Sequence, residues 1–210
     1  MQKKTRGRPT QDEAGRLTEN LISVASKMFE EEGFSAVSMN RIAATAGIGK
    51  DTLYSRFSNK EALFFAVIDR QAKQHRSTCP ALEGSDIPVG DALRQYAQWV
   101  VQASSSPGAI SRNLLFYREG QRFPQLGEIF MESYDNMFVS PMEKYFAFLK
   151  GQGAYKGIAS EKLARLFCNS VLSTLNNRLI IRHDMPDTRE VNRHIDNVVQ
   201  IFTLGMGGAG

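Results

Sequence analysis

Residues 47–57, GIGKDTLYSRF, place many hydrogen-bonding side chains on a short segment that follows a glycine turn. A helix that presents donors and acceptors at its N-terminal end can enter the major groove of DNA, where each base pair offers a distinct pattern. The alternative is a solvated surface helix, since a polar helix face is common on protein surfaces. At helical spacing, the outward face of this segment would carry Lys50, Asp51, Thr52, Ser55 and Arg56.

Two short helices joined by a tight turn would position this face. Ser38 is a suitable N-cap for a helix that ends at Gly47, and a second short helix is expected from about Lys50 to Phe57. Together they predict a helix-turn-helix. The apolar residues expected to hold the pair together are Ile42, Ala43, Ile48, Leu53 and Phe57.

Helical periodicity continues along the chain and strand alternation is nearly absent, so we expect an all-α fold. A first helix is expected to end near Gly33, and Ser58 with Glu61 reads as a capping box that opens a fourth helix. Residues 77–88 are expected to form a loop. Pro141 falls inside a long helix and predicts a kink there. The later helices are expected at about 88–103, 109–120, 124–150, 160–182 and 188–204.

The composition is that of an ordinary globular protein, with 210 residues, 42% hydrophobic residues and a net charge of +4. The chain has no apolar run long enough for a membrane span and no secretion signal, so we expect a cytoplasmic protein. Cys79 and Cys168 share no metal-ligand spacing with any histidine, which favours free thiols and no metal. No phosphate loop or serine–histidine constellation occurs, so we expect neither a cofactor nor an enzyme. Catalysis at an unrecognised site is the competing hypothesis.

Residues 28–67, MFEEEGFSAVSMNRIAATAGIGKDTLYSRFSNKEALFFAV, resemble the N-terminal DNA-binding domain of the TetR family of transcriptional regulators. Two positions depart from the family pattern: Gly49 stands where a capping serine is frequent, and Asp51 stands where a small residue is usual. The matching positions are Phe29, Gly33, Phe34, Ser38, Ile42, Ala43, Ala46, Gly47, Ile48, Thr52, Leu53, Tyr54, Phe57 and residues 60–63.

The resemblance implies three parts: a basic flexible arm (1–10), a three-helix helix-turn-helix DNA-binding domain (11–62), and a larger helical ligand-binding and dimerisation domain (63–210). Residues 112–130 also resemble a C-terminal domain found in part of the family. It further implies a ligand-responsive regulator, a repressor, that binds a palindromic DNA operator as a homodimer. A small, largely apolar effector would release it. An architectural DNA-binder without an effector is the alternative.

The resemblance also implies roles for single residues. Tyr54 would donate its hydroxyl to a phosphate, and Lys60 would hold a phosphate together with a helix N-terminus. Their alternatives are a packing tyrosine and a surface lysine, and for Ser38 a simple cap. Lys50 is the candidate for a guanine. The further candidates for DNA contacts are Asn40, Thr45, Thr52, Ser55 and Arg56.

The first ten residues hold four basic side chains and no acid. Within them, Arg6-Gly7-Arg8-Pro9 resembles the core of an AT-hook, which would place Arg6 and Arg8 in a narrow minor groove. The alternative is a basic tail that raises affinity through counterion release, without sequence preference.

Aromatic residues recur at helical spacing through the larger domain. Core packing explains most of them, but an effector cavity needs some together with a few polar groups. The fourth helix, which begins at Lys60, is expected to act as a lever between DNA and effector. The terminal helices 160–182 and 188–204 carry apolar stripes expected to pair in a dimer. The candidate pocket residues are Trp99, Asn113, Phe116, Phe130, Tyr134, Phe138 and Phe167.

Overall fold

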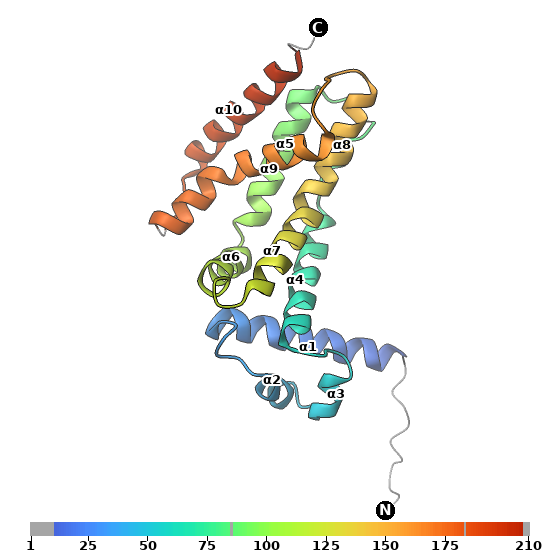
Figure 1. Cartoon of the computed structure of the whole chain (residues 1–210), viewed down its shortest axis with the longest axis vertical. Coiled ribbons are helices and arrows are strands. Elements are labelled where there is room, and N and C mark those ends of the chain that lie inside the picture. The colour runs from blue at the N-terminus through green and yellow to red at the C-terminus, as the bar shows by residue number, and fades with distance from the viewer. Residues whose placement is uncertain (1–10, 85, 183, 208–210) are drawn as a thin grey trace, which may run out of the picture. The chain divides into compact units, whose positions relative to one another are not determined.

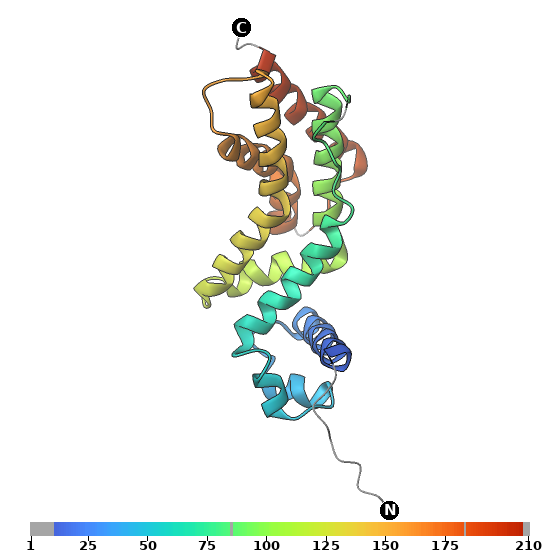
Figure 2. The ribbon, with the colours of Figure 1, turned by 90° about the vertical axis from the view of Figure 1, so that its right-hand side faces the viewer.

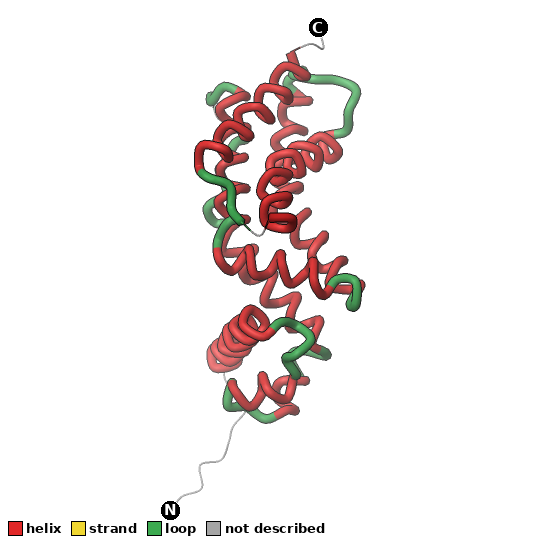
Figure 3. The backbone as a smooth tube through the Cα atoms, turned by 90° about the vertical axis from the view of Figure 1, so that its left-hand side faces the viewer, coloured by secondary structure: helices red, strands yellow, loops and turns green. Residues whose placement is uncertain are grey.

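The computed structural model describes residues 11–84, 86–182 and 184–207 (Figure 1). Every regular element in these ranges is helical, which confirms the all-α prediction (Figure 3). The elements are α1 (Gln11–Glu32), α2 (Met39–Thr45), α3 (Lys50–Tyr54), α4 (Lys60–Arg76), α5 (Val89–Ser104), α6 (Pro107–Glu119), α7 (Pro124–Tyr134), η1 (Asp135–Val139), α8 (Ser140–Gly151), α9 (Ser160–Asn177), η2 (Arg178–Arg182) and α10 (Thr188–Gly207).

The chain forms two compact units, and the division falls inside α4. The first unit ends at Arg70 and the second begins at Gln71. Because α4 runs without interruption from Lys60 to Arg76, it belongs to both units. The boundary at 62/63 drawn from the sequence lies eight residues earlier, at the beginning of the same helix.

Three phenylalanines form the centre of the first unit. Phe29 of α1, Phe34 of the following loop and Phe64 of α4 lie with ring centroids 5.2–5.6 Å apart. Phe34 and Phe64 are almost completely buried. Burying such rings stabilises a fold by about 1.5–3 kcal/mol each, so this cluster fixes α1 and the start of α4 as the support for α2 and α3.

The predicted capping box at the start of α4 is wrong by one residue. Asn59, and not Ser58, caps the helix, because its Oδ1 accepts a hydrogen bond of 2.7 Å from the backbone N–H of Ala62. Asn and Ser are nearly equivalent as N-caps, so the two adjacent residues compete for this position. The helix therefore starts at Lys60.

The second unit packs its helices around one hydrophobic core. α9 contacts α5, α8 and α10, and α10 also packs along α5 (Figure 1). Tyr96 of α5, Phe146 of α8 and Phe167 of α9 are among its most completely buried side chains. The same core includes Trp99 and Phe138, and Tyr134 packs against it.

The segment predicted as one kinked helix over 124–150 is divided by a π-helical turn. α7 leads into η1, and α8 follows directly. The N–H of Ser140 bonds the carbonyl of Asp135, five residues back. Proline has no N–H, so the regular bond from residue 141 to the carbonyl of Met137 cannot form. The irregularity thus lies just before Pro141, and it is a widened turn.

Membrane-spanning helices and metal-ligand groups were looked for among the described residues only. Within these residues, no helix is both long and apolar enough to cross a membrane. No group of three or more potential metal ligands comes together among the same residues. Cys79 is half-buried and Cys168 is buried, and both are free thiols.

Candidate DNA interface and aromatic cluster

The turn between α2 and α3 has the geometry that a helix-turn-helix needs. Gly47 adopts a φ of 69°, which favours glycine, and Ile48 donates its N–H to the carbonyl of Ala43 at 3.0 Å. The N–H of Gly47 bonds Ala44 at 3.1 Å, which completes a Schellman motif. The turn ends α2 and redirects the chain into α3.

Most of the predicted DNA-contacting side chains on α2 and α3 are exposed. Lys50, Ser55 and Tyr54 project from α3 and its C-terminal end, and 48% of Tyr54 is accessible. Thr52 is half-buried. On α2, Asn40 and Thr45 are also exposed. Leu53 of α3 is fully buried, so the apolar side of α3 faces the unit and the polar side does not.

Two of the predicted contacts at the end of α3 already have partners within the chain. Arg56 donates from Nε to the hydroxyl of Thr18 on α1 at 3.1 Å, and Thr18 donates to Ala14 at 3.0 Å. Ser55 donates its hydroxyl to the carbonyl of Thr52 at 2.9 Å. Arg56 therefore connects the end of α3 to α1, and its other guanidinium nitrogens remain for another acceptor.

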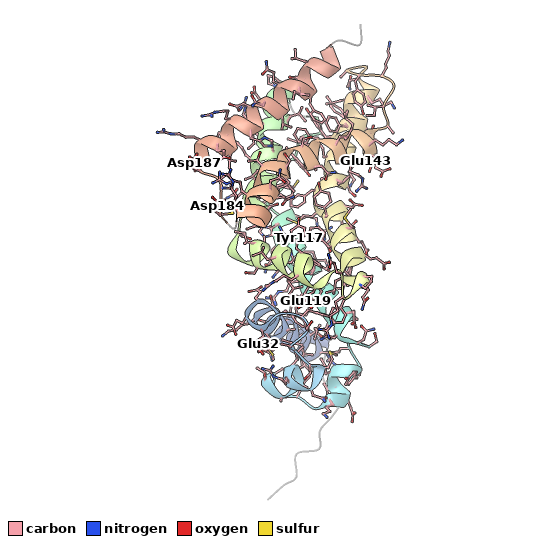
Figure 4. All side chains as sticks on the ribbon, turned by 60° about the vertical axis from the view of Figure 1, so that its left-hand side comes forward. Glu32, Tyr117, Glu119, Glu143, Asp184 and Asp187 are labelled. Atoms are coloured by element: carbon pink, nitrogen blue, oxygen red, sulfur yellow. The ribbon has the colours of Figure 1, made fainter. Side chains whose placement is uncertain are left out.

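Ser38 and Arg41 organise the start of α2. Ser38 is the N-cap and accepts from the N–H of Arg41 at 3.3 Å. Arg41 makes a bidentate ion pair with Glu32 at the end of α1, at 2.7 and 2.9 Å, and the hydrogen bond to Glu32 raises its pKa. Glu32 is labelled in Figure 4. Sequence reasoning missed this pair, because no local pattern joins residues nine positions apart on two helices separated by a loop.

Lys60 has a structural role that the sequence did not reveal. Its ammonium donates to the carbonyls of Phe34 at 2.8 Å and Val37 at 3.0 Å, and lies 4.2 Å from the ring centroid of Phe34. These contacts fix the loop between α1 and α2 to the start of α4. The predicted arm residues Arg6 and Arg8 lie outside the described residues.

Five of the predicted pocket residues form what we call the aromatic cluster: Trp99, Phe116, Phe130, Tyr134 and Phe138. Phe138 lies 5.6 Å from both Trp99 and Tyr134, measured between ring centroids. Phe116 of α6 and Phe130 of α7 are 4.6 Å apart. Tyr134 follows Phe130 by one turn of α7, so helix geometry connects the two groups.

The structure does not place the other two predicted pocket residues in this cluster. Phe167 packs against Phe146 and Phe202 at 6.1 and 5.1 Å, in the core between α8, α9 and α10. Asn113 is half-buried on α6. Phe167 thus has the packing role that aromatic residues at helical spacing usually have.

Polar groups around the cluster are bonded to one another. The hydroxyl of Tyr96 donates to the carbonyl of Phe138 at 2.7 Å, and the thiol of Cys168 reaches the same carbonyl at 3.4 Å. Burial raises the pKa of Tyr96 far above its ordinary value. Tyr134 donates to Asn169 at 2.7 Å, and its pKa is raised mainly by burial as well. Both phenols are therefore neutral hydrogen-bond donors at pH 7.

The C-terminal part of α4 is bonded to α6 through a residue that the sequence analysis did not select. Arg112 donates to Oε1 of Gln71 at 2.5 Å. One turn further along α4, the pKa of His75 is lowered, first by burial and second by the positive charge of Arg112. The residues are 41 positions apart, so no local signal could have shown the pair.

Three hollows are lined by described residues of the second unit. One, of about 210 Å³, lies between Pro80–Glu83, Tyr96 and α8. A second, of about 300 Å³, lies beside Arg178, which pairs with Asp184 and Glu190. Asp184 and Asp187 are labelled near this end of α10 in Figure 4. The third hollow lies between α9 and α10. None of the predicted pocket residues lines any of the three.

An exposed apolar surface lies on α9 and α10. Leu166, Ile201 and Leu204 are 53%, 67% and 68% accessible, and the third hollow, of about 240 Å³, lies beside the first two. The residues from which the sequence predicted a dimer interface lie mostly inside the core of the chain. Those buried residues are Phe167, Val171, Leu175, Leu179, Ile195, Val198 and Val199.

Two sequence families match the chain. Residues 21–67 match "Bacterial regulatory proteins, tetR family", and residues 91–204 match "AefR-like transcriptional repressor, C-terminal domain". The second match alone covers more than half of the chain. The HTH-type transcriptional regulator SAB2452 of Staphylococcus aureus is 48% identical over 52 residues. That match spans 25% of this chain and 28% of the relative, so it concerns only part of each protein.

Solved structures share the fold across nearly the whole chain. The flavonoid-responsive regulator FrrA has a TM-score of 0.76 at 24% identity, covering 90% of this chain and 95% of FrrA. A TetR-family transcriptional regulator of Mesorhizobium loti has a TM-score of 0.77 at 23% identity, covering 93% and 98%. SmeT in complex with triclosan has a TM-score of 0.66 at 19% identity, covering 89% and 91%.

The family matches and the geometry agree. A helix-turn-helix with an exposed polar α3 occupies the part that matches the first family, and a helical unit with its own core occupies the part that matches the second. The matched families are families of regulators and not of enzymes. The chain belongs to the TetR family of bacterial transcriptional regulators.

Proposed function

We propose that this chain is a ligand-responsive transcriptional repressor that binds a palindromic operator as a homodimer in the cytoplasm. The observation that carries the proposal is the exposed polar side of α3, which follows a Schellman turn and is anchored by the buried Leu53. A helix supported in this way can enter a major groove without rearrangement.

Different residues of the DNA-binding unit would contact bases and phosphates. Lys50, exposed at the first position of α3, is the candidate for a guanine contact, worth about 1–3 kcal/mol of discrimination. Tyr54 would donate to a phosphate, as would the free nitrogens of Arg56. Asn40, Thr45, Thr52 and Ser55 are candidates for flanking contacts. Arg6 and Arg8 would extend the contact into a minor groove.

Lys60 would contribute differently from the other candidates. Its ammonium holds the carbonyls of Phe34 and Val37, so we assign it mainly to positioning α2 and α3. A phosphate near the N-terminus of α4 would still be attracted by its charge.

Selection of bound sequences from a random duplex library, at about 150 mM salt, tests DNA recognition. We expect an inverted repeat to be enriched, and Lys50→Ala to relax the preference at one base pair of each half-site. Tyr54→Phe should weaken binding to all sequences alike. A protein that retains every duplex equally would contradict the proposal.

The dimer is proposed on the exposed apolar surface of α9 and α10. Leu166, Ile201 and Leu204 are exposed on these two helices, and Leu166 and Ile201 line one hollow. Exposed apolar side chains that lie together often mark a protein–protein interface. An isologous interface would bring these residues against the same residues of a second copy. Light scattering at micromolar concentration should give twice 23.5 kDa, and Ile201→Glu with Leu204→Glu should reduce it to the monomer.

The effector is proposed to be a small, largely apolar aromatic compound. The aromatic cluster supplies apolar rings, and Tyr96, Tyr134 and Asn169 supply polar groups close to it. Two proteins with the same fold are a flavonoid-responsive regulator and SmeT in complex with triclosan, and both flavonoids and triclosan are aromatic. A thermal-shift screen of flavonoids, chlorinated phenols and polar controls tests the proposal. If only polar compounds stabilise the protein, the assignment is wrong.

An architectural DNA-binder without an effector is the second candidate. The observation that favours it is the dense bonding around Phe138, where the polar groups near the cluster already have partners in the chain. Failure of every aromatic compound to bind would support this candidate.

A further inference from the structure

We propose that Asp51 of α3 recognises a base of the operator: its carboxylate accepts a hydrogen bond from the exocyclic amine of a cytosine in each half-site. The inference rests on the proposed function and adds a specificity-determining residue to it. The other candidate contacts on α2 and α3 are basic or neutral side chains, and Asp51 is an acid on the same surface. A carboxylate selects among bases differently from a basic side chain, because it accepts hydrogen bonds and does not donate them.

Asp51 lies on the side of α3 that faces away from the first unit. The N–H of Ser55 bonds the carbonyl of Asp51 at 2.9 Å, so the two residues are one helical turn apart. Leu53, which is fully buried, is two residues from Asp51 and therefore about 200° away around the helix. Asp51 is accordingly exposed, and α3 lies at the edge of the first unit beside α2 (Figure 2). A partner that contacts the exposed side of α3 therefore meets this carboxylate.

The carboxylate of Asp51 has no partner within the described part of the chain. It makes no hydrogen bond or ion pair with another described residue. Other exposed acids of the first unit are paired: Glu32 bonds Arg41 at 2.7 Å, and Glu31 lies 3.9 Å from Lys27. Because Asp51 has no counterpart of this kind, its acceptor oxygens are available to a molecule outside the chain.

The chemistry of DNA limits what this carboxylate can bind. Phosphates carry negative charge and only accept hydrogen bonds, so they repel it. In the major groove, guanine and thymine present acceptors, whereas the N4 amine of cytosine and the N6 amine of adenine present donors. On adenine the donor lies beside N7, an acceptor that repels the second carboxylate oxygen, and cytosine has no acceptor at the corresponding position. Cytosine is therefore the base that fits an aspartate best.

The neighbouring Lys50 indicates where in the half-site this base lies. Consecutive Cα atoms are about 3.8 Å apart, and stacked base pairs are about 3.4 Å apart. Lys50 and Asp51 are adjacent and both exposed, so they reach the same base pair or pairs only a step or two apart. The positions at which Lys50→Ala and Asp51→Ala lose their base preference should therefore coincide or lie within about two base pairs of each other.

The test compares the operators that the wild type and two variants select from one random duplex library at about 150 mM salt. Asp51→Ala removes the acceptor, so we expect the same inverted repeat with the preference for cytosine lost at one position of each half-site. Asp51→Asn has nearly the same shape but offers a donor and an acceptor, which match N7 and the N6 amine of adenine. We therefore expect adenine to replace cytosine at that same position.

A binding titration gives the size of the effect. Two duplexes are compared that differ only at this base pair of one half-site, where they carry the selected cytosine or an adenine. The wild type should bind the cytosine duplex about tenfold more tightly, and Asp51→Asn should reverse the order. The matched control is Glu31→Gln, which removes the same charge from an exposed position of α1 and should prefer cytosine like the wild type. A rise in affinity for both duplexes that the control shares reports charge alone.

The outcomes separate this inference from the proposed function. If Asp51→Ala and Asp51→Asn select the wild-type operator, or change the affinity for all sequences alike, Asp51 recognises no base, and the inference is overturned while the function stands. A wild-type preference for another base at the position that the variants change would also overturn it. A wild-type chain that selects no operator would overturn both. If one variant melts below the assay temperature, the other decides.

Discussion

The polar side chains on α3 and those around the aromatic cluster differ in whether they are already hydrogen-bonded within the chain. On α3 of the first unit, Lys50 and Tyr54 are exposed and available to a partner. Around the aromatic cluster of the second unit, Tyr96 and Tyr134 donate to groups of the same chain. Among the described residues, no buried side-chain nitrogen or oxygen is without a hydrogen-bond partner.

This difference indicates how each unit would bind. A surface of available donors can bind DNA as a rigid body. A cluster whose polar groups are already bonded must exchange those bonds when a ligand enters, so binding there changes the protein. The unit that rearranges is the one expected to sense an effector, and the unit that does not rearrange is the one expected to read a sequence.

The largest effect is expected from Lys60, whose ammonium is bonded within the first unit, unlike the exposed Lys50. Lys60→Met removes two charge-assisted hydrogen bonds and leaves the carbonyls of Phe34 and Val37 without this donor. We expect a loss of about 2 kcal/mol in the free energy of unfolding. Lys50→Met, at an exposed position, is the control and should melt like the wild type. Equal melting of both variants would show that the bonds of Lys60 do not stabilise the unit.

The next effect tests the bonded polar groups of the second unit. Tyr96→Phe removes a side-chain donor to the carbonyl of Phe138, which the weak donor Cys168 also reaches. The expected cost is about 1 kcal/mol, read from urea unfolding. Tyr117→Phe, at a position 44% exposed, should be neutral. An unchanged Tyr96→Phe variant would show that this hydroxyl is not essential to the closed cluster.

A smaller effect concerns pH and the contact between α4 and α6. Burial and Arg112 hold the pKa of His75 below its ordinary value of 6.5, so the unfolded chain takes up this proton first. The free energy of unfolding therefore decreases as pH falls below about 6.5. Above that pH, His75 is neutral in both states and this destabilising effect is absent. His75→Gln should lose less stability than the wild type between about pH 7.5 and 5.5. An identical pH dependence of Tm in the two proteins would argue against the shift.

The smallest effect is expected at the start of α3. Gly49 caps this helix with φ −70° and ψ 150°, which other residues adopt readily, and it provides no side-chain hydrogen bond. An added Cβ would lie 3.9 Å from the nearest atom, Oγ1 of Thr52. Gly49→Ser should therefore stabilise the unit by a few tenths of a kcal/mol. A lower Tm for Gly49→Ser than for Gly49→Ala would contradict the capping argument.

Local signals in the sequence predicted the helix-turn-helix well. The Ser38 cap and the turn at Gly47 depend on residues a few positions apart, and the structure contains both. The π-helical turn was predicted only as a kink at Pro141, because proline shows where a bond is missing but not how the chain responds. The sequence predicted Ser58 as the cap of α4, and the structure has Asn59 there. Two adjacent residues of similar capping strength cannot be ranked from the sequence.

Contacts between distant residues could not be predicted in the same way. Lys60 reaches carbonyls 23 and 26 residues away, and Arg112 reaches Gln71 across 41 residues. Helical spacing likewise could not show that Phe138 packs on Trp99 and Tyr134. Nor could it show that Phe167 packs on Phe146 and Phe202, because both residues repeat with the helix.

The most direct test of the account is a titration of the selected operator with the protein, with and without a compound that stabilises the protein in the thermal-shift screen. If the rearranging unit controls the rigid one, the compound should lower operator affinity by about 5–150-fold, equivalent to 1–3 kcal/mol of coupling. Compounds that stabilise the protein and leave operator affinity unchanged would contradict the account.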